Sequence, residues 1–383
     1  MIIPPSISKQ FQSIYKSEPL IIRSPGRINL IGEHTDYNDG FVLPAAIDKA
    51  IYLGFVKNNL QECRVYSLDF QEEETFLLKE MYPRKGWINF IMGVTAQVKA
   101  AGYAIEGFDC VFGGDIPIGA GLSSSAALEN GVGYGLSELF CLNLEKLDMI
   151  QFSQKAENEF VGLNCGIMDM FASMMGKKDH AIKLDCRSLD YDYFPVKLGK
   201  YEFLLCDSQV SHSLANSAYN KRREECELGV KMIRTLYPQV KNLRDVDLRM
   251  LESQKKDLPA KVFDRCDFVI RENKRLIKSC EALDMEDLVT FGEMLYGSHL
   301  GLSKNYEVSC EELDFLVEKT QGMPFVLGAR MMGGGFGGCT LNLVEIAQRE
   351  TFITSLSDAY REQFGKSMKV YEVRIEDGTS LGQ

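Results

Sequence analysis

Residues 113–139 read GGDIPIGAGLSSSAALENGVGYGLSEL, and the rest of the chain is organised around this stretch. An apolar run at 108–112 predicts a strand directly before it, and the Ala-Ala-Leu at 126–128 predicts a helix directly after it. Between them, glycines let the backbone approach a ligand closely, and the serines at 123–125 fall at the expected helix N-terminus. Free N–H groups and hydroxyls at such a terminus bind anions, most often phosphate.

The segment 117–126, PIGAGLSSSA, lacks the Gly-Lys-Ser/Thr of a Walker A loop. Taken alone, such a Gly/Ser turn could be an ordinary strand-to-helix connection with a serine at the helix N-cap. The complete PxGxGLSSSA pattern instead favours phosphate binding. A serine hydroxyl in the first helical turn could also hold a magnesium ion, as the Ser/Thr of a P-loop does.

The chain of 383 residues carries a net charge of −11, which argues against a broad nucleic-acid-binding surface. Its eleven cysteines include no CxxC pair, so we expect buried thiols of a reducing cytoplasm, without a zinc site or a disulfide framework. No signal peptide opens the sequence, and no apolar run approaches the ~20 residues of a membrane span. We expect a cytoplasmic protein without nucleic-acid or membrane partners, and we take it to be a monomer.

Hydrophobic periodicity predicts a mixture of strands and helices. The expected strands are 20–23, broken by Pro25-Gly26, and 41–44, 50–56, 64–70, 108–112, 181–185, 201–206, 339–344 and 369–375. The expected helices are 6–17, 87–101, 144–160, 164–175, 217–236, 260–283, 285–301, 310–320 and 346–364. Their order has no regular βαβ rhythm, which favours an α+β fold over a doubly wound sheet.

A polar segment at 190–200 interrupts the pattern, and we place a domain boundary there. The predicted domains are 1–195 and 196–383. The second contains a glycine loop, GGGFGG at 333–338. Because glycine costs backbone entropy, this loop implies close approach of a ligand or of another chain segment.

A polar turn follows the first strand and contains Glu33, His34 and Asp36. Two carboxylates and an imidazole in one turn could hold sugar hydroxyls or a metal, although the spacing matches no HExxH motif. A solvated turn is the plain alternative. Arg27 lies between Gly26 and apolar residues, an unusual place for a solvated arginine, and could stabilise charge in a phosphoryl transfer.

Two further carboxylates are candidates. Asp169, in CGIMDMFASMM, has small residues around it on the expected helix, so a ligand could pack over it. It is a candidate base or charge-orienting group for a hydroxyl, the alternative being an exposed helical aspartate. Glu157, on the preceding helix, could complete a magnesium site with a serine of the loop, or could simply be solvated.

Together these residues resemble one family, the galactokinases among the GHMP kinases. The resemblance rests on RINLIGEHTDYN at 27–38, PIGAGLSSSA at 117–126, CGIMD at 165–169 and GGGFGGCT at 333–340, and it runs from about residue 20 to the C-terminus. It implies an N-terminal domain like ribosomal protein S5 domain 2, a ferredoxin-like C-terminal domain, and an active site in the cleft between them.

The resemblance also implies roles for individual residues. Asp169 would face the C1 hydroxyl of galactose, either abstracting its proton or orienting it, and Arg27 would stabilise the transition state. The other galactose contacts would be Glu33, His34, Thr35, Asp36, Tyr219 and the backbone of Gly166. The ATP phosphates would lie against Gly119, Ala120, Gly121, Leu122, Ser123, Ser124 and Ser125, with Ser67 and Trp87 beside the adenine. Ser125 and Glu157 would ligate Mg²⁺.

Taken singly, Tyr219 could be a partly buried helix tyrosine, and Trp87, the only tryptophan, a core residue. With the resemblance, we expect transfer of the γ-phosphoryl group of ATP to D-galactose, giving α-D-galactose 1-phosphate and ADP in galactose catabolism, the Leloir pathway. The alternatives are a kinase of a related sugar, such as N-acetylgalactosamine or arabinose, and a non-catalytic sensor of galactose and ATP on the same fold.

Overall fold

The computed structural model of the chain describes residues 4–117, 119–210 and 215–382. The strands are β1 (Leu20–Asn29), β2 (Phe41–Val42), β3 (Pro44–Lys57), β4 (Glu62–Ser67), β5 (Glu72–Leu77), β6 (Phe108–Gly114), β7 (His180–Asp185), β8 (Tyr191–Pro195), β9 (Tyr201–Asp207), β10 (Val326–Met331), β11 (Cys339–Glu345), β12 (Lys369–Val373) and β13 (Ser380–Leu381). The α-helices are α1 (Pro4–Tyr15), α2 (Ile88–Ala100), α3 (Ser124–Phe140), α4 (Lys146–Ala156), α5 (Met168–Met175), α6 (Ala215–Ile233), α7 (Leu248–Ser253), α8 (Ala260–Asp284), α9 (Leu288–Lys304), α10 (Glu311–Gln321) and α11 (Arg349–Phe364).

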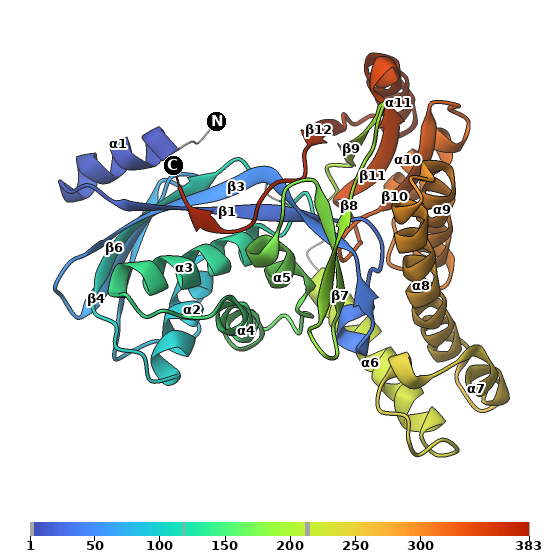
Figure 1. Cartoon of the computed structure of the whole chain (residues 1–383), viewed down its shortest axis with the longest axis horizontal. Coiled ribbons are helices and arrows are strands. Elements are labelled where there is room, and N and C mark those ends of the chain that lie inside the picture. Colours follow the sequence, from blue (N-terminus) through green and yellow to red (C-terminus); the bar gives the residue numbers. More distant parts are fainter. Residues whose placement is uncertain (1–3, 118, 211–214, 383) are drawn as a thin grey trace.

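The first half of the chain is built on a six-stranded sheet with the order β13-β1-β3-β6-β4-β5. All its pairs are antiparallel except β4 with β6. Helices α3 and α5 pack on β1 and β3, and α2 and α4 pack on α3, so they cover one face of the sheet. Figure 1 shows α1 alone on the opposite face. This mostly antiparallel sheet with segregated helices agrees with the predicted α+β class.

The second half carries a four-stranded antiparallel sheet with the order β10-β11-β9-β12, and a short sheet β2-β7-β8 lies between the two. Helices α8 and α9 pack together, and α9 lies along β10 (Figure 1). One apolar core cluster includes Ile31 and Val42 from the first half and Leu276 and Phe291 from the second. The halves therefore share a core, which fixes their relative position.

The Pro25-Gly26 pair does not end the first strand, so that prediction was wrong. Strand β1 continues to Asn29, and its register against β3 shifts between Pro25 and Arg27. At this point Gly26 of β1 faces three residues of β3, 47–49, so the extra residues lie on β3, and such an irregularity accommodates a proline in a strand. A Cβ at Gly26 would come within 2.7 Å of the Leu122 carbonyl oxygen, and the Arg27 N–H donates to that oxygen at 3.1 Å. Strand β1 therefore contacts the serine loop directly at Gly26 and Arg27.

Several short elements have no clear periodicity and were not predicted: β5, β8, β10, β13 and α7. The helix expected at 164–175 begins only at Met168, and α4 ends at Ala156 in a π-helical turn, Glu157–Val161. Strand β8 lies in the polar segment 190–200 and pairs with β7, whereas β9 joins the four-stranded sheet. Strand β13 returns to pair with β1, so residues near the C-terminus complete the first sheet.

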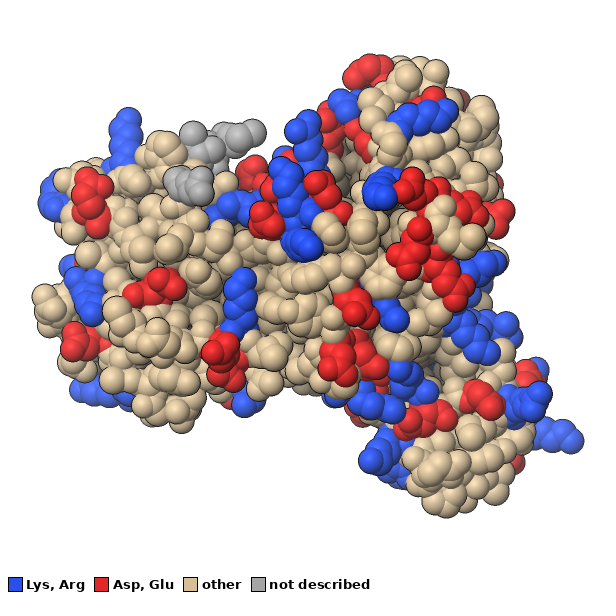
Figure 2. All heavy atoms as spheres, in the orientation of Figure 1, with Lys and Arg blue, Asp and Glu red and all other residues tan. Residues whose placement is uncertain are grey.

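The surface agrees with the composition. On the face drawn in Figure 2, basic and acidic side chains are interspersed over both halves, without an extended basic area. Among the described residues, no helix combines the length and apolar character that a membrane crossing would require.

The close contact between α9 and β10 gives a test of the fold. A Cβ on Gly292 would overlap the backbone of Leu327, whereas a Cβ on Gly297 of the same helix would meet only Arg275 at an ordinary 3.5 Å. We expect Gly292→Ala to lower the free energy of unfolding by about 1–3 kcal/mol through overpacking. Gly297→Ala should be neutral or stabilising by up to ~1 kcal/mol, because alanine favours helix. Urea unfolding of both variants would check this; equal midpoints would contradict the packing.

Candidate active site

The serine loop joins β6 to α3, as the sequence predicted, and α3 begins inside the serine triplet at Ser124. Gly119 and Gly121 have positive φ angles of 79° and 75°, the region that glycine adopts without strain. Ala120 and Leu122 are buried and pack in the apolar core, so they hold the loop against it. Ile118 lies outside the described residues. The first N–H groups of α3 have no intrahelical partner, so the helix start can receive an anion.

The structure brings Arg27 and Asp169 together at the edge of this loop. The Arg27 Nε and Nη2 atoms lie 2.9 and 3.0 Å from the two Asp169 oxygens, a bidentate ion pair. Arg27 Nη1 also donates to the Gly121 carbonyl at 2.5 Å, and the Ser123 hydroxyl donates to Asp169. Arg27 is only 4% exposed and Asp169 is 31% exposed, so the carboxylate presents one side to a ligand. The hydroxyl of Ser123 is thus engaged with Asp169.

The polar turn is tied to the second half of the chain. Glu33 is buried, pairs with Arg330 at 2.7 Å, and accepts from the Gly333 N–H at 2.7 Å. Thr35 has its hydroxyl within 2.8 Å of the Gly32 carbonyl and 2.6 Å of the Phe41 carbonyl, so it holds the turn itself closed. Thr35 therefore supports the turn from behind.

Asp36 faces Gly166, and the two fit only because residue 166 has no side chain. A Cβ at Gly166 would coincide with the Asp36 carboxylate. Burial raises the pKa of Asp36 to about 7, and the charge of Asp169 adds to the shift. Asp36 can therefore exchange a proton near neutral pH and can either donate to or accept from a hydroxyl.

Three neighbouring cavities meet at these residues. The innermost, about 50 Å³, is lined by most of the residues predicted to contact the sugar, namely Glu33, His34, Asp36, Gly166 and Tyr219, and by Arg27, Asp169, Cys165, Met168, Gly333 and Gly334. A second, about 180 Å³, is lined by Ser125, Glu157 and Asp169. Asp169 therefore lies on both, between the polar turn and the serine loop.

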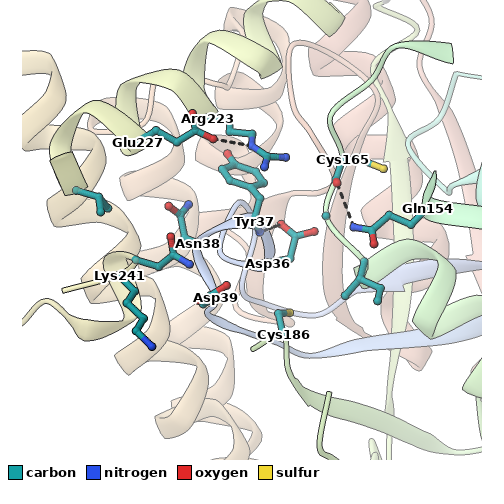
Figure 3. Close-up of a pocket in the computed structure, with 14 residues that line it drawn as sticks. Asp36, Tyr37, Asn38, Asp39, Gln154, Cys165, Cys186, Arg223, Glu227 and Lys241 are labelled. Atoms are coloured by element: carbon teal, nitrogen blue, oxygen red, sulfur yellow. Dashed lines mark hydrogen bonds and ion pairs between the residues drawn. The ribbon is translucent and has the colours of Figure 1, made fainter. Parts of the chain in front are cut away.

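The third cavity, about 390 Å³, lies on the other side of Asp36 and Gly166. Figure 3 shows Asp36 and Tyr37 facing Gln154 and Cys165 across it, with Arg223 paired to Glu227 of α6 at its edge. It separates the polar turn from α4 and α6.

Ser125 and Glu157 lie together as the sequence predicted. Both line the same cavity; burial followed by the charge of Asp169 raises the pKa of Glu157 to about 7, and the Ser125 hydroxyl partly offsets this rise. Oxygen donors of this kind suit Mg²⁺, which keeps several waters and takes phosphate oxygens as ligands. The described residues contain no group of three His, Cys, Asp or Glu side chains that could hold a metal alone. A metal here would therefore need oxygens from a bound ligand.

Ser67 and Trp87 gather around one residue of β6. Ser67 is buried and pairs with Phe112 across the sheet, and its hydroxyl accepts from the Phe70 N–H at 3.3 Å. The half-buried Trp87 ring meets the Phe112 ring edge-on at 5.1 Å. Both lie at the end of β6 that leads into the serine loop.

The glycine loop at 333–338 packs against other segments of the chain, which is one of the two alternatives expected from the sequence. Gly335 and Gly337 leave no room for a Cβ beside the carbonyls of Val308 and Val210. Gly333 lies against the Gly121 carbonyl, and Gly334 lies against the Tyr219 ring. The loop thus closes the cavity from the second half and touches the serine loop.

Two site residues had no clear signal in the sequence. Arg330 is fully buried, donates to the carbonyls of Asn29 and Leu30 at 2.9 and 3.0 Å, and pairs with Glu33. Glu129 follows Ser125 by one helical turn and is fully buried, with neither carboxyl oxygen hydrogen-bonded. Only its position in a run of small and apolar residues could have marked Glu129.

Three family models match the chain. They are the galactokinase galactose-binding signature at residues 9–56, the GHMP kinases N-terminal domain at 89–177 and the GHMP kinases C-terminal model at 276–362. The first covers the polar turn, and the second covers the serine loop and Asp169.

Relatives match over nearly the whole length. Galactokinases of a Roseiflexus species and of Thermotoga maritima are 40% and 42% identical, over 97% and 93% of this chain and 95% and 98% of theirs. The crystal structure of Lactococcus lactis galactokinase with galactose is 36% identical, with a TM-score of 0.94 over 98% of each chain. A mevalonate kinase structure, 18% identical, covers 94% of this chain and 99% of its own with a TM-score of 0.65, which indicates a shared fold.

The buried carboxyls give a test of the site's electrostatics. Burial and the charges of Glu157 and Asp169 raise the pKa of Glu129 well above its usual value. Stability linked to an acid with a raised pKa in the folded state is lost as pH rises above the pKa in the unfolded chain. Glu129→Gln removes this loss. The melting temperature of the variant minus that of wild type should therefore increase as the pH rises from 5 to 8.

The control is Glu138→Gln, an exposed position on the same helix, which should follow wild type at every pH. Both are measured without ligand and with EDTA present. A constant difference between Glu129→Gln and wild type across this range would show that Glu129 titrates normally.

Proposed function

The chain belongs to the galactokinase family, and from that premise we propose that it transfers the γ-phosphoryl group of ATP to the C1 hydroxyl of D-galactose. The observation that carries the proposal is the position of Asp169. This one carboxylate, paired with Arg27, lines both the cavity at the polar turn and the cavity at the serine loop. An acceptor hydroxyl beside it would lie where a phosphoryl group from the serine loop could reach it.

On the sugar side, Glu33, His34 and Asp36 would contact the hydroxyls of galactose, with Tyr219 closing the cavity from α6. Carboxylates and an imidazole offer both donors and acceptors, as a polyhydroxylated neutral ligand requires. Thr35 would act through the shape of the turn. The backbone of Gly166 would leave room for Asp36 to reach the sugar.

On the nucleotide side, the backbone from Gly119 to Ser125 and the start of α3 would surround the ATP phosphates. Trp87 and Ser67 would lie near the adenine, at the start of the same loop. Ser125 and Glu157 would hold Mg²⁺, which when bound neutralises charge on the phosphate oxygens.

The mechanism at Asp169 follows from its bonds. Arg27 donates to both carboxylate oxygens and Ser123 donates to one of them. Because these oxygens already accept hydrogen bonds, the carboxylate is a weaker base. We propose that Asp169 first orients the C1 hydroxyl and receives its proton late, as the O–P bond forms. Arg27 keeps the pair neutral and stabilises charge in a loose transition state.

The eleven cysteines are all free thiols, which suits a reducing compartment. We propose that the protein acts in the cytoplasm, as a monomer, in the conversion of galactose to its 1-phosphate.

A coupled ADP-release assay across a panel of sugars tests the function. We expect turnover with galactose to exceed that with N-acetylgalactosamine and arabinose by at least ~10-fold in kcat/KM, because one mismatched group costs about 1–3 kcal/mol. A preference for one of the other sugars would assign the chain to a related kinase. Binding of galactose and ATP without turnover would make it a sensor.

Asp169→Asn should lower kcat while galactose still binds, since asparagine keeps the shape and can hydrogen-bond the hydroxyl. Loss of a general base is worth roughly 10²–10⁴-fold, and a fall near tenfold would favour orientation over proton abstraction. Calorimetric titration with galactose controls for an intact cavity. A rate close to wild type would make Asp169 structural.

Ser125→Ala should weaken the response to Mg²⁺ by removing one oxygen ligand. The readout is the Mg²⁺ concentration for half-maximal rate, together with Mn²⁺ binding in the presence of ADP. Chelation by EDTA should stop turnover of the wild type without lowering its melting temperature. An unchanged Mg²⁺ requirement in Ser125→Ala would remove this serine from the metal site.

A further inference from the structure

We propose that Tyr37 and Tyr306 are positioning residues that hold the imidazole of His34 as the Nε2–H tautomer, so that it donates a hydrogen bond to the sugar. The proposal rests on the proposed function in one respect, that the ligand of the inner cavity is a sugar. It concerns a chain of hydrogen bonds behind the site.

The chain of bonds is continuous. His34 Nδ1 lies 2.7 Å from the Tyr37 hydroxyl, which lies 2.8 Å from the Tyr306 hydroxyl, which lies 3.2 Å from the Cys226 sulfur. On the other side of the ring, His34 Nε2 lies 3.2 Å from the Gly334 carbonyl oxygen. The chain crosses from the polar turn to α6 and to the end of α9, so both halves of the protein contribute.

The direction of every proton follows from one end. A carbonyl oxygen can only accept, so Nε2 carries the hydrogen that points at Gly334. Burial lowers the pKa of His34 to about 3, so the ring is neutral near pH 7 and Nδ1 must be an acceptor. The Tyr37 hydroxyl therefore donates to Nδ1. Each hydroxyl has one hydrogen, so Tyr306 donates to Tyr37 and its own oxygen is left to accept from the Cys226 thiol.

The ring has little freedom to turn away from this arrangement. His34 has a left-handed backbone φ of 61°, and its ring lies between the rings of Tyr219 and Tyr306, with centroids at 5.2 and 4.9 Å. Tyr306 is fully buried. Packing fixes where the imidazole lies, and the Gly334 carbonyl keeps the proton on Nε2 in the ligand-free protein. When a ligand replaces that carbonyl, the Tyr37 hydroxyl at Nδ1 would keep it there.

This selection has a consequence for recognition. Tyr37 occupies Nδ1, so Nε2–H is the polar group that His34 presents to the cavity, and Gly334 is its acceptor in the ligand-free protein. A sugar hydroxyl would replace the Gly334 carbonyl as acceptor. Sugar binding would then release one bond between the polar turn and the glycine loop.

The tautomer can be observed directly. The chain has four histidines, so ¹⁵N-histidine labelling gives few signals, and His34→Gln identifies the one from His34. We expect the ¹⁵N shifts of His34 to show a pure Nε2–H form in wild type with and without galactose, and a mixture of tautomers in galactose-bound Tyr37→Phe. An Nδ1–H form in wild type, or the wild-type tautomer in galactose-bound Tyr37→Phe, would overturn the proposal.

The effect on recognition is tested with Tyr306→Phe, which removes one oxygen that lies two hydrogen bonds away from the His34 imidazole. We expect galactose Kd and KM to rise about five- to tenfold, as for loss of a hydrogen bond, with kcat changed less. The control is Tyr296→Phe, whose hydroxyl bonds Thr320 at 3.0 Å between α9 and α10, and which should bind galactose like wild type.

Deoxygalactoses separate positioning from a general loss of structure. The Tyr306→Phe effect should vanish for the one deoxygalactose that lacks the hydroxyl contacted by His34, and persist for the others. An equal effect on every analogue would overturn the proposal. If wild type did not phosphorylate galactose, the proposed function would fail, whereas the tautomer result would stand, so the two failures are distinguishable.

Discussion

The bidentate pair between Arg27 and Asp169 is the interaction on which the rest of the site depends. Three separate features of the chain bring it about: the register shift between β1 and β3 at Gly26, the start of α5 near Asp169, and the left-handed Ser123 in the serine loop. An ion pair this well hydrogen-bonded holds its geometry, because any shift leaves a buried charge unpaired. The cavity at the polar turn and the cavity at the serine loop are therefore positioned by the same ion pair.

A second buried pair joins the two halves of the molecule. Glu33 and Arg330 are both buried; the Gly333 N–H donates to Glu33, and Arg330 Nη1 donates to two main-chain carbonyls. Buried ion pairs of this kind contribute little net stability compared with apolar packing. What the pair does provide is register: the polar turn can meet the glycine loop in only one position. The shared apolar core supplies the stability that this arrangement needs.

The site also concentrates carboxyls that destabilise the ligand-free protein. Asp36, Glu157 and Glu129 all have raised pKa values, with burial as the largest cause and neighbouring carboxylates adding to it. A bound cation would reduce this repulsion. The strain is thus of the kind that proteins retain at sites where a ligand relieves it. Structural thiols such as Cys110, buried in the sheet, take no part in this chemistry.

The sequence alone determined the family, the α+β class and most long elements, because these depend on local patterns: the serine loop, the polar turn and the helical periodicity of segments such as α8. It also predicted that Arg27, Asp169, Ser125 and Glu157 carry the chemistry, and these residues do lie together. Tertiary structure decided the rest. Edge strands such as β8 and β13 form only because a partner strand is present. Strand β1 continues past Pro25-Gly26, where the Leu122 carbonyl accepts from the Arg27 N–H.

The roles of Arg330, Glu129 and Tyr306 depend on contacts between residues far apart in the chain. Arg330 reads locally as a charge that should face water, and only the fold provides the carboxylate and carbonyls that bury it. The Tyr306 hydroxyl lies 269 residues from its partner in Tyr37. No local pattern encodes such a bond, because it arises only when the two halves pack together around the same core.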